Sequence, residues 1–549
     1  MANVDPERFL EELRFDIETE NLIKARLVMA HYSRMDAQTQ RKALYELSKT
    51  PDSFIFPLLV GVLGSASASD EVDPALKELL FSRALDNPEQ LSQMLVREVK
   101  PSHRVVLAEV AGEIKLETAT PVLLGILNEE QDEKSLRGAI VALGMIGDPS
   151  ATTPISEYLY ASSVELVIAA IQALGTLSTP TAIQRLAEKL GADHDLDYMI
   201  LDVFAASQEP EALDRLNDTL SAQLAHLRNA GKQRLLDIGR KAVPVLISNL
   251  RYDDPDLLIH TLNVMGDIGD ESAISPIRKL LHNEPRDANV RFAAYEALGK
   301  LPMAKGAFAL AQGLSDPVDN VRSAAASAID HNYNMVLAAG IKNMVRDENP
   351  AERLISRTIM DTECDTIFMD LVQEDLFREY AIEYLCSQAH NDIRSHFSEL
   401  LKSHGEDEMA AAIESRTCEE KRGTLKIFAV DDSKMILNIY RSVLHNLGCE
   451  PVLFEFPAEA IEQVRSAKPD LIFTDLNMPD ISGVELTLAV RKWFTKDELP
   501  IVMVTTQNES QDNEAAVQAG INAILHKPFN EETLRAAIAE QIGQDGKPS

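Results

Sequence analysis

The sequence predicts a multidomain chain, in which an α-solenoid precedes an α/β domain with a doubly wound sheet of five parallel strands. Its 549 residues are too many for one compact core and suggest several units. A helical pattern broken by glycine and proline recurs through the first part of the chain. After Gly423 this pattern stops, and short apolar strands alternate with amphipathic helices.

An internal repeat defines the first part of the chain. The sequence LGMIGD at residues 143–148 returns as MGDIGD at residues 265–270, and several of the residues that follow also agree. The offset of 122 residues corresponds to four units of about 30 residues, and weaker copies fill the interval. Because a helix pair of this length cannot bury its apolar face alone, we expect the pairs to stack into a solenoid.

Each unit is expected to hold two short amphipathic helices. Apolar residues of the second helix recur at helical spacing, for example at Val290, Ala294 and Leu298. We expect the glycine that follows, Gly299 in this unit, to end the helix, because glycine adopts the left-handed cap conformation at little cost. A proline such as Pro276 then falls in or near the first turn of the next helix, where its missing N–H matters least.

The repeated pattern resembles a known family of helical repeats. The pairs Val290-Arg291 and Val321-Arg322, each followed by alanines, match the second helix of HEAT repeats. The short variety seen in phycobilisome-lyase-like proteins is the most similar. The resemblance covers residues 100–335 well and implies an armadillo-like solenoid whose surfaces bind protein.

The expected domain boundaries follow from where this resemblance fades. We expect the HEAT-repeat solenoid to cover residues 1–404, with degenerate or capping repeats at 1–100 and 335–404. Residues 405–423 are rich in charge and are expected to form an acidic, solvated linker around a short possible helix. The α/β domain is then expected over residues 424–545.

Five strand–helix units are expected in this last domain. The strands are expected at Leu425–Val430, Val452–Phe454, Leu471–Thr474, Ile501–Val504 and Ala523–Leu525. The helices are expected at residues 433–447, 458–467, 484–492, 513–519 and 531–542. This alternation favours a parallel sheet with right-handed crossovers, whose functional site lies at the carboxyl ends of the strands.

Reactive side chains fall at those strand ends. Asp431 and Asp432 follow the first strand, Asp475 the third, Thr505 the fourth and Lys527 the fifth. Carboxylates that converge in one crevice repel one another unless a cation joins them, and oxygen ligands alone favour Mg²⁺. A partly free carboxylate can attack phosphorus, while a metal, an ammonium and a hydroxyl stabilise the charge on the transferring oxygens.

These residues resemble the receiver domain of two-component response regulators, and the match spans residues 425–545. The stretch MPDISG at residues 478–483 matches the loop that follows the acceptor in that family. The resemblance implies a flavodoxin-like fold in which Asp475 is the phosphoacceptor, Thr505 the switch hydroxyl and Lys527 the phosphate-pairing lysine. It also implies Mg²⁺ bound by Asp431, Asp432, Asp475 and the backbone carbonyl of Asn477.

The sequence departs from the family pattern at two places. An aromatic residue usually stands three positions before the lysine, where this chain has Ile524. The small residue usual after the switch threonine is replaced by Thr506. Neither change touches the chemistry, so we expect phosphorylation to be retained. Whether the hydroxyl–aromatic coupling usual in the family transmits the signal here stays open.

The resemblance implies a regulator whose output is protein binding. A sensor histidine kinase would transfer a phosphoryl group to Asp475 in an Mg²⁺-dependent step, and this would control the protein interactions of the solenoid. The chain would be a phosphoacceptor with at most autodephosphorylation activity rather than an enzyme. A homodimer is a further expectation, and no DNA-binding segment is expected after residue 545.

Composition limits the classes of partner and the cellular compartment that we expect. With 53 basic and 87 acidic side chains the net charge is -34, which argues against nucleic acid or an anionic lipid surface as the partner. Four cysteines without a Cys-x-x-Cys pair indicate neither a zinc site nor a disulfide framework. The start lacks the features of a signal peptide, and a cytoplasmic protein without membrane insertion is expected.

Three alternatives remain open from the sequence. The chain could be a phosphate sink or adaptor, whose receiver drains a kinase while the solenoid only localises it. It could be a bilin lyase, because HEAT proteins similar to this one attach bilins to cysteine, although only the repeat type supports this. It could also bind nucleic acid, as some HEAT-type DNA-repair glycosylases do, against which the acidic balance argues.

Overall fold

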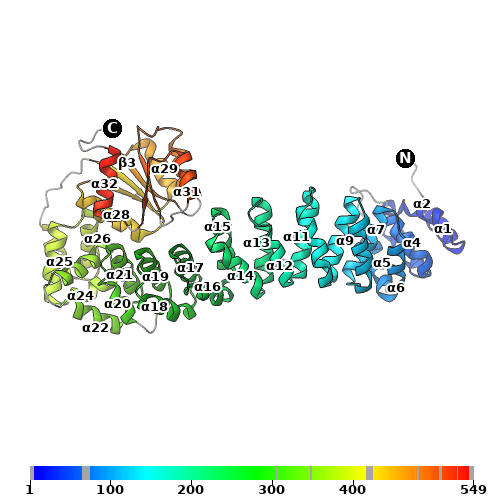
Figure 1. Ribbon diagram of the computed structural model, residues 1–549, viewed down its shortest axis with the longest axis horizontal. Helices are drawn as coiled ribbons and strands as arrows, with labels where there is room; N and C mark the ends of the chain where they lie inside the picture. The colour runs from blue at the N-terminus through cyan, green and yellow to red at the C-terminus, as the bar shows by residue number, and fades with distance from the viewer. Residues whose placement is uncertain are drawn as a thin grey trace. The chain divides into compact units, whose positions relative to one another are not determined.

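The computed structural model describes residues 5–64, 74–302, 307–346, 349–415, 425–476, 478, 481–505, 510–527 and 529–542. The chain divides into two compact units, residues 1–216 and residues 217–549, which are described separately. Pairs of antiparallel helices run through both units, and the second unit also contains a sheet (Figure 1). Among the described residues, no helix combines the length and the apolar character needed to cross a bilayer.

The first unit consists of helices joined by short turns. Its helices are α1 (Pro6–Glu18), α2 (Leu22–Met29), α3 (Ala37–Leu47), α4 (Asp52–Leu63), α5 (Pro74–Asp86), α6 (Pro88–Arg97), α7 (Pro101–Glu113), α8 (Thr120–Glu129), α9 (Glu133–Ile146), α10 (Thr152–Glu157), α11 (Val164–Leu177), α12 (Pro180–Ala187) and α13 (His194–Ser207). α14 (Pro210–Asp218) contains the boundary between the units. The second helices of successive pairs pack side by side, α7 on α9, α9 on α11 and α11 on α13, as expected for stacked repeats.

The second unit continues the same pattern. Its helices are α15 (Ala225–Ile238), α16 (Val243–Asn249), α17 (Pro255–Ile268), α18 (Ile274–His282), α19 (Ala288–Lys300), α20 (Ala307–Gly313), α21 (Asp319–His331), α22 (Met335–Met344), α23 (Pro350–Asp361), α24 (Asp365–Leu371), α25 (Asp375–Ser387), α26 (Asn391–Ser403) and α27 (Asp407–Ser415). Alternate helices again pack in series, from α15 on α17 to α25 on α27. α27 lies within the stretch expected to be a linker, and it packs on α25 and α26.

Glycine has two different roles in these repeats. Gly147 and Gly269 end α9 and α17 in the left-handed conformation, with φ of 84° and 71°, as predicted. Gly299, however, does not end its helix, because α19 continues to Lys300. A Cβ atom at Gly299 would lie 3.2 Å from the Cα of Ala328, so this glycine lets two helices approach closely. The prediction that Gly299 caps its helix was therefore wrong. A glycine stands at this position because two helices pack closely there.

The same close approach recurs between successive repeats. A Cβ at Gly144 would lie 2.7 Å from the Cα of Ala173, and one at Gly266 would lie 2.9 Å from the Cα of Ala297. Real Cβ atoms do not come this close to backbone, so glycine is required at both positions. The pairing of glycine with alanine in the next repeat thus sets the spacing of the helices.

The sheet of the second unit is parallel throughout. Its strands are β1 (Lys426–Val430), β2 (Glu450–Phe454), β3 (Leu471–Asp475), β4 (Ile501–Thr505) and β5 (Ala523–His526), in the spatial order β2-β1-β3-β4-β5. Each strand lies within two residues of its expected bounds. The connecting helices are α28 (Lys434–Asn446), α29 (Pro457–Ser466), α30 (Gly483–Val490), α31 (Ser510–Ala519) and α32 (Glu531–Ile542). The doubly wound sheet predicted for this part of the chain is confirmed.

Both faces of the sheet are covered by helices. Residues of β1 alternate, so that Ile427 joins one apolar cluster and Phe428 the other. α28 and α32 cover the first face, whereas α29, α30 and α31 cover the second. Strands buried on both faces require apolar residues at nearly every position, which is why the sequence reads as short apolar runs.

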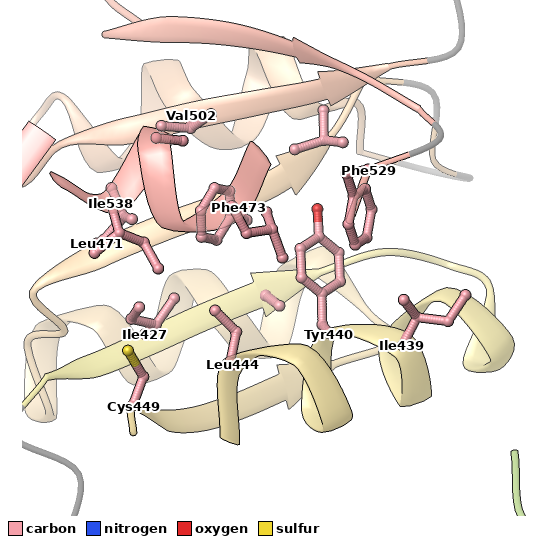
Figure 2. Packing of buried hydrophobic residues seen from close by; sticks show 14 of the residues in the cluster. Ile427, Ile439, Tyr440, Leu444, Cys449, Leu471, Phe473, Val502, Phe529 and Ile538 are labelled. Atoms are coloured by element: carbon pink, nitrogen blue, oxygen red, sulfur yellow. The ribbon is translucent and has the colours of Figure 1, made fainter. Parts of the chain in front are cut away.

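An aromatic stack occupies the first of these clusters. The ring of Tyr440, on α28, stacks on Phe529 with centroids 4.5 Å apart and on Phe473 with centroids 5.7 Å apart (Figure 2). Tyr440 is 1% exposed, and its hydroxyl has no hydrogen-bond partner among the residues that the structure describes. A buried hydroxyl without a partner lowers the stability of the fold.

The close approach at Gly144 yields the first prediction. Gly144→Ala should lower the free energy of unfolding by about 1–3 kcal/mol, because the new methyl group overlaps Ala173. Gly125→Ala is the matched control: it lies inside α8, where an added Cβ meets nothing within 4 Å, so it should be neutral or stabilise by about 0.5–1 kcal/mol. Urea unfolding measures both, and equal effects would contradict the close-contact explanation.

The hydroxyl of Tyr440 yields the second prediction. Tyr440→Phe keeps the stacked ring and removes the unpartnered hydroxyl, so it should raise the free energy of unfolding by about 1 kcal/mol. Tyr384→Phe removes a hydroxyl that is equally buried but donates to Asp361, and should lower the free energy by about 1–2 kcal/mol. Chemical unfolding of both variants tests the opposite signs, and a loss of stability in Tyr440→Phe would refute the assignment.

Candidate functional site

Three carboxylates meet at the carboxyl edge of the sheet. Asp475 is the last residue of β3, and Asp431 and Asp432 follow the neighbouring strand β1. Parallel strands end at the same edge, and one carboxylate oxygen from each residue lies within 4.8 Å of the others. Asp431 is 1% exposed and Asp475 9%, whereas Asp432 is open to solvent. The structure therefore brings together the acidic residues that the sequence singled out.

A lysine neutralises part of this cluster. The Nζ atom of Lys527 lies 2.6 Å from Oδ2 of Asp431 and 3.2 Å from Oδ1 of Asp475. Burial alone would lower the pKa of Lys527, but the two carboxylates outweigh it and hold that pKa above its ordinary value. Lys527 therefore carries its charge inside the crevice, directly between the two buried acids.

The electrostatics of Asp475 differ from those of a surface aspartate. Burial raises the pKa of Asp475, the Lys527 ammonium opposes this rise, and the carboxylates of Asp431 and Asp432 add to it. Three carboxylates and one ammonium leave an excess of negative charge in a region poor in water. Such a site favours the binding of a cation.

The remaining predicted residues fall at the same edge or outside the described part. Thr505 is the last residue of β4 and is 1% exposed, and its carbonyl oxygen accepts a hydrogen bond of 2.8 Å from the backbone N–H of Lys527. Ile524 lies on β5 and packs against the second apolar cluster. Asn477 and Thr506 lie outside the residues that the structure describes. The predicted role of the Asn477 carbonyl as a metal ligand therefore stays a prediction.

Local sequence positions the end of β3 and the helix that follows it. The backbone N–H of Gly483 donates to the carbonyl of Leu476 at 3.0 Å, which folds the chain back on itself directly after Asp475. A Cβ at Gly483 would lie 2.1 Å from the carbonyl oxygen of Asp475, so glycine is required there. Ser482 and Glu485 then form a capping box that starts α30.

The aromatic stack lies close to this crevice and was not identified from the sequence. Burial raises the pKa of the Tyr440 hydroxyl well above its ordinary value, and the carboxylates of Asp431 and Asp475 add to the effect. Phe473 precedes Asp475 by two residues and Phe529 follows Lys527 by two. Their proximity to the site could have been read from these positions, but Tyr440 looks like any other apolar residue of an amphipathic helix.

The cluster fits a hexacoordinate divalent cation. All its donors are carboxylate oxygens, which Mg²⁺ prefers, and one of the three residues faces solvent, where waters can complete the coordination. Oxygens around Mg²⁺ at about 2.1 Å lie about 3–4 Å apart, which agrees with carboxylate oxygens that all lie within 4.8 Å of one another. The three carboxylates present at this edge therefore suit Mg²⁺.

Two family models match separate parts of the chain. The model of the response regulator receiver domain matches residues 427–539, the α/β part of the second unit. The model of HEAT repeats matches residues 88–175 and residues 243–330. Both predicted resemblances are confirmed.

Known proteins match the receiver part. Chemotaxis protein CheY1 of Helicobacter pylori is 34% identical over 121 residues, which cover 22% of this chain and 98% of that protein. The polar-differentiation response regulator DivK of Brucella abortus is 28% identical over 124 residues, which cover 22% of this chain and 98% of its own. Among solved structures, chemotaxis response regulator CheY4 of Vibrio cholerae is 33% identical and matches 21% of this chain and 97% of its own, with a TM-score of 0.20.

A further solved structure is the receiver domain of the sensor histidine kinase PA1611 of Pseudomonas aeruginosa, described with a magnesium ion in its active-site cleft. It is 26% identical, covers 22% of this chain and 98% of its own, and has a TM-score of 0.21. Receiver domains accept phosphoryl groups from partners such as histidine kinases and bind Mg²⁺ in the active site. With its acidic cluster, its lysine and the match over residues 427–539, the chain belongs to the response regulators, as a receiver domain combined with HEAT repeats.

Proposed function

We propose that this response regulator accepts a phosphoryl group on Asp475 from a histidine kinase, and that the phosphoryl group controls the protein interactions of the solenoid. Asp431, Asp432, Asp475 and the carbonyl of Asn477 would hold Mg²⁺. The solenoid would cover residues 1–404 and bind a protein target, and the receiver would cover residues 424–545. Self-association into a homodimer is part of the same proposal.

One observation supports the role of Asp475 most directly. The Lys527 ammonium contacts Asp475 and Asp431 together, at the carboxyl edge where Thr505 also ends its strand. This arrangement brings an ammonium into contact with the proposed acceptor carboxylate and ends a hydroxyl-bearing residue at the same edge of the sheet. Phosphoryl transfer needs such groups, because the charge of the transition state spreads over the phosphoryl oxygens.

The chemical step uses the carboxylate as the nucleophile. An Oδ atom of Asp475 attacks the phosphorus of a phosphohistidine; a P–O bond forms while the P–N bond breaks. The bonding pair returns to the imidazole nitrogen, which takes a proton from solvent, so no other reactant is needed. Bound Mg²⁺ would supply positive charge next to the phosphoryl oxygens. Lys527 would pair with the product dianion, and the Thr505 hydroxyl would donate to one of its oxygens.

The phosphate-sink alternative makes a different statement about the solenoid. In a sink, phosphorylation of the receiver would change neither the contacts of the solenoid nor its assembly. In this structure α28 of the receiver packs against α21 and α23 of the same unit. This contact favours a regulator that acts through its solenoid over a phosphate sink. We therefore propose that the phosphoryl group changes the contact between the receiver and the repeats.

Intact-mass measurement tests the acceptor. Incubation with acetyl phosphate and Mg²⁺ should add one phosphoryl group to the wild type, and EDTA should prevent this. Asp475→Asn should give no adduct, while Asp497→Asn, an exposed aspartate before β4, should behave as the wild type. Lys527→Ala should slow the labelling about 100-fold, because it removes the charge that pairs with the phosphoryl oxygens. A wild type that takes up no phosphoryl group would overturn the proposed function.

Thermal unfolding tests the charge of the cluster. Because the folded-state pKa of Asp475 is raised, its ionisation opposes folding once the pH exceeds the ordinary carboxyl pKa. Without divalent cations, Asp475→Asn should therefore stabilise the fold by about 1–3 kcal/mol at neutral pH and by less at acid pH. Added Mg²⁺ should stabilise the wild type more than the variant, because it binds the folded cluster.

The exposed variant Asp497→Asn serves as the control for this experiment as well. Its unfolding temperature should follow that of the wild type with and without Mg²⁺. Equal responses of the wild type and Asp475→Asn to Mg²⁺ would show that the cluster does not bind the ion.

A further inference from the structure

The receiver is held against the repeats of its own unit along α28. The Ser442 hydroxyl donates to Oδ2 of Asp361 at 3.1 Å, and the guanidinium of Arg441 pairs with the carboxylate of Glu363. The rings of His445 and His390 meet edge to face, with centroids 4.7 Å apart. These contacts hold the receiver on the solenoid. They lie on the later turns of α28, whereas its first turn follows the acidic pair.

A second contact reaches the phosphorylation site itself. Asn289, on α19, donates a side-chain hydrogen bond to the backbone carbonyl of Lys527, the residue whose ammonium lies between Asp431 and Asp475. Phe292, one turn further along α19, packs on the apolar cluster that contains Tyr440 and Phe529. The solenoid thus contacts the backbone of Lys527 and the adjacent apolar cluster, while the lysine side chain contacts Asp431 and Asp475 in the site.

Glu296 extends this face of α19. Positions 289, 292 and 296 recur at helical spacing and lie on one side of the helix. Burial raises the pKa of Glu296; the ammonium groups of Lys300 and Lys527 oppose the rise, and the carboxylate of Asp431 adds to it. The charged groups of the phosphorylation site are therefore part of the surroundings of this solenoid carboxylate.

A phosphoryl group on Asp475 would disturb both parts of this contact. The phosphoryl oxygens would compete with Asp431 for the Lys527 ammonium. A reorientation of the lysine side chain would shift its backbone carbonyl, which accepts the hydrogen bond from Asn289. The added negative charge would also repel the carboxylate of Glu296, whose pKa already reflects the charges of Lys527 and Asp431. Both effects weaken the contact with α19, whereas the α28 contacts lie further from the site.

We propose that α19 is the element of the solenoid that reads the phosphorylation state: it holds the chain around Lys527 while Asp475 is free and releases it when Asp475 is phosphorylated. This inference rests on the proposed acceptor role of Asp475. By linkage, if the phosphoryl group weakens the α19 contact by a given factor, an intact α19 contact disfavours the phosphoryl group by the same factor. The face formed by Asn289, Phe292 and Glu296 is then no longer covered by the chain around Lys527.

Beryllofluoride with Mg²⁺, a non-covalent mimic of the phosphoryl group, gives an equilibrium test on the full chain. Asn289→Ala and Glu296→Gln should each bind the mimic about fivefold more tightly than the wild type. The first removes the competing hydrogen bond, and the second removes a carboxylate that repels the mimic. Asn283→Ala and Glu271→Gln make the same chemical changes at exposed positions and should bind as the wild type does.

Hydrogen exchange reports on the contact itself. In the wild type, amides of residues 288–300 and 523–534 should be protected without the mimic and exchange faster with it; in Asn289→Ala they should exchange fast in both states. If the mimic binds but exchange and affinity are unchanged by it or by both variants, the role of α19 is refuted while the acceptor role stands. Failure of the mimic to bind, together with no labelling by acetyl phosphate, would overturn the proposed function and this inference with it.

Discussion

The contact of one ammonium with two buried carboxylates holds together the candidate site at the carboxyl edge of the sheet. Lys527 lies 2.6 Å from Asp431 and 3.2 Å from Asp475, and it arrives there because β5 runs parallel to the strands that carry the acids. Without this charge, the carboxylates would face one another in a nearly dry crevice. The lysine lowers the repulsion but does not cancel it, so the site keeps an affinity for cations.

The position of Lys527 also explains how chemistry at one side chain can reach the repeats. Its side chain enters the site, its carbonyl accepts from Asn289, and Phe529, two residues later, stacks on Tyr440. A movement of this short segment therefore changes a charge contact, a hydrogen bond and an aromatic stack together. Family members place an aromatic switch at the position of Ile524, and here the stack on α28 offers a different connection to the same lysine.

Much of the α/β part could be predicted from the sequence, because apolar runs buried on both faces are hard to mistake and because their ends carry the reactive residues. Strand bounds agree to within two residues, and the side chains of Asp431, Asp432, Asp475 and Lys527 meet as expected. The repeats were harder to read in detail. A glycine at the end of an apolar stripe can cap its helix, as Gly269 does, or can allow a neighbouring helix to pack closely. The sequence pattern is the same in both cases.

The contact between α19 and the site could not be predicted at all. Asn289 and Lys527 are 238 positions apart, and no periodic pattern links a side chain on a helical repeat to a carbonyl after a strand. Tyr440 was missed for a related reason: its spacing is that of any core residue on α28. The hydroxyl without a partner becomes visible only when the surroundings of the ring are known.

The packing of α19 determines which side of the contact moves. Gly266 of α17 meets Ala297 of α19 at a distance that leaves no room for a further methyl group, and Gly299 of α19 lies close to Ala328 of α21, where an added Cβ would be 3.2 Å from the Cα. A helix fixed on two sides by backbone contacts cannot shift without separating its neighbours, and close-packed interiors resist such separation. Lys527 itself directly follows β5, and a residue just beyond the end of a strand moves more easily than a residue of a packed helix. A change at Asp475 is therefore taken up by the receiver, while the solenoid presents an unchanged surface that is either covered or free.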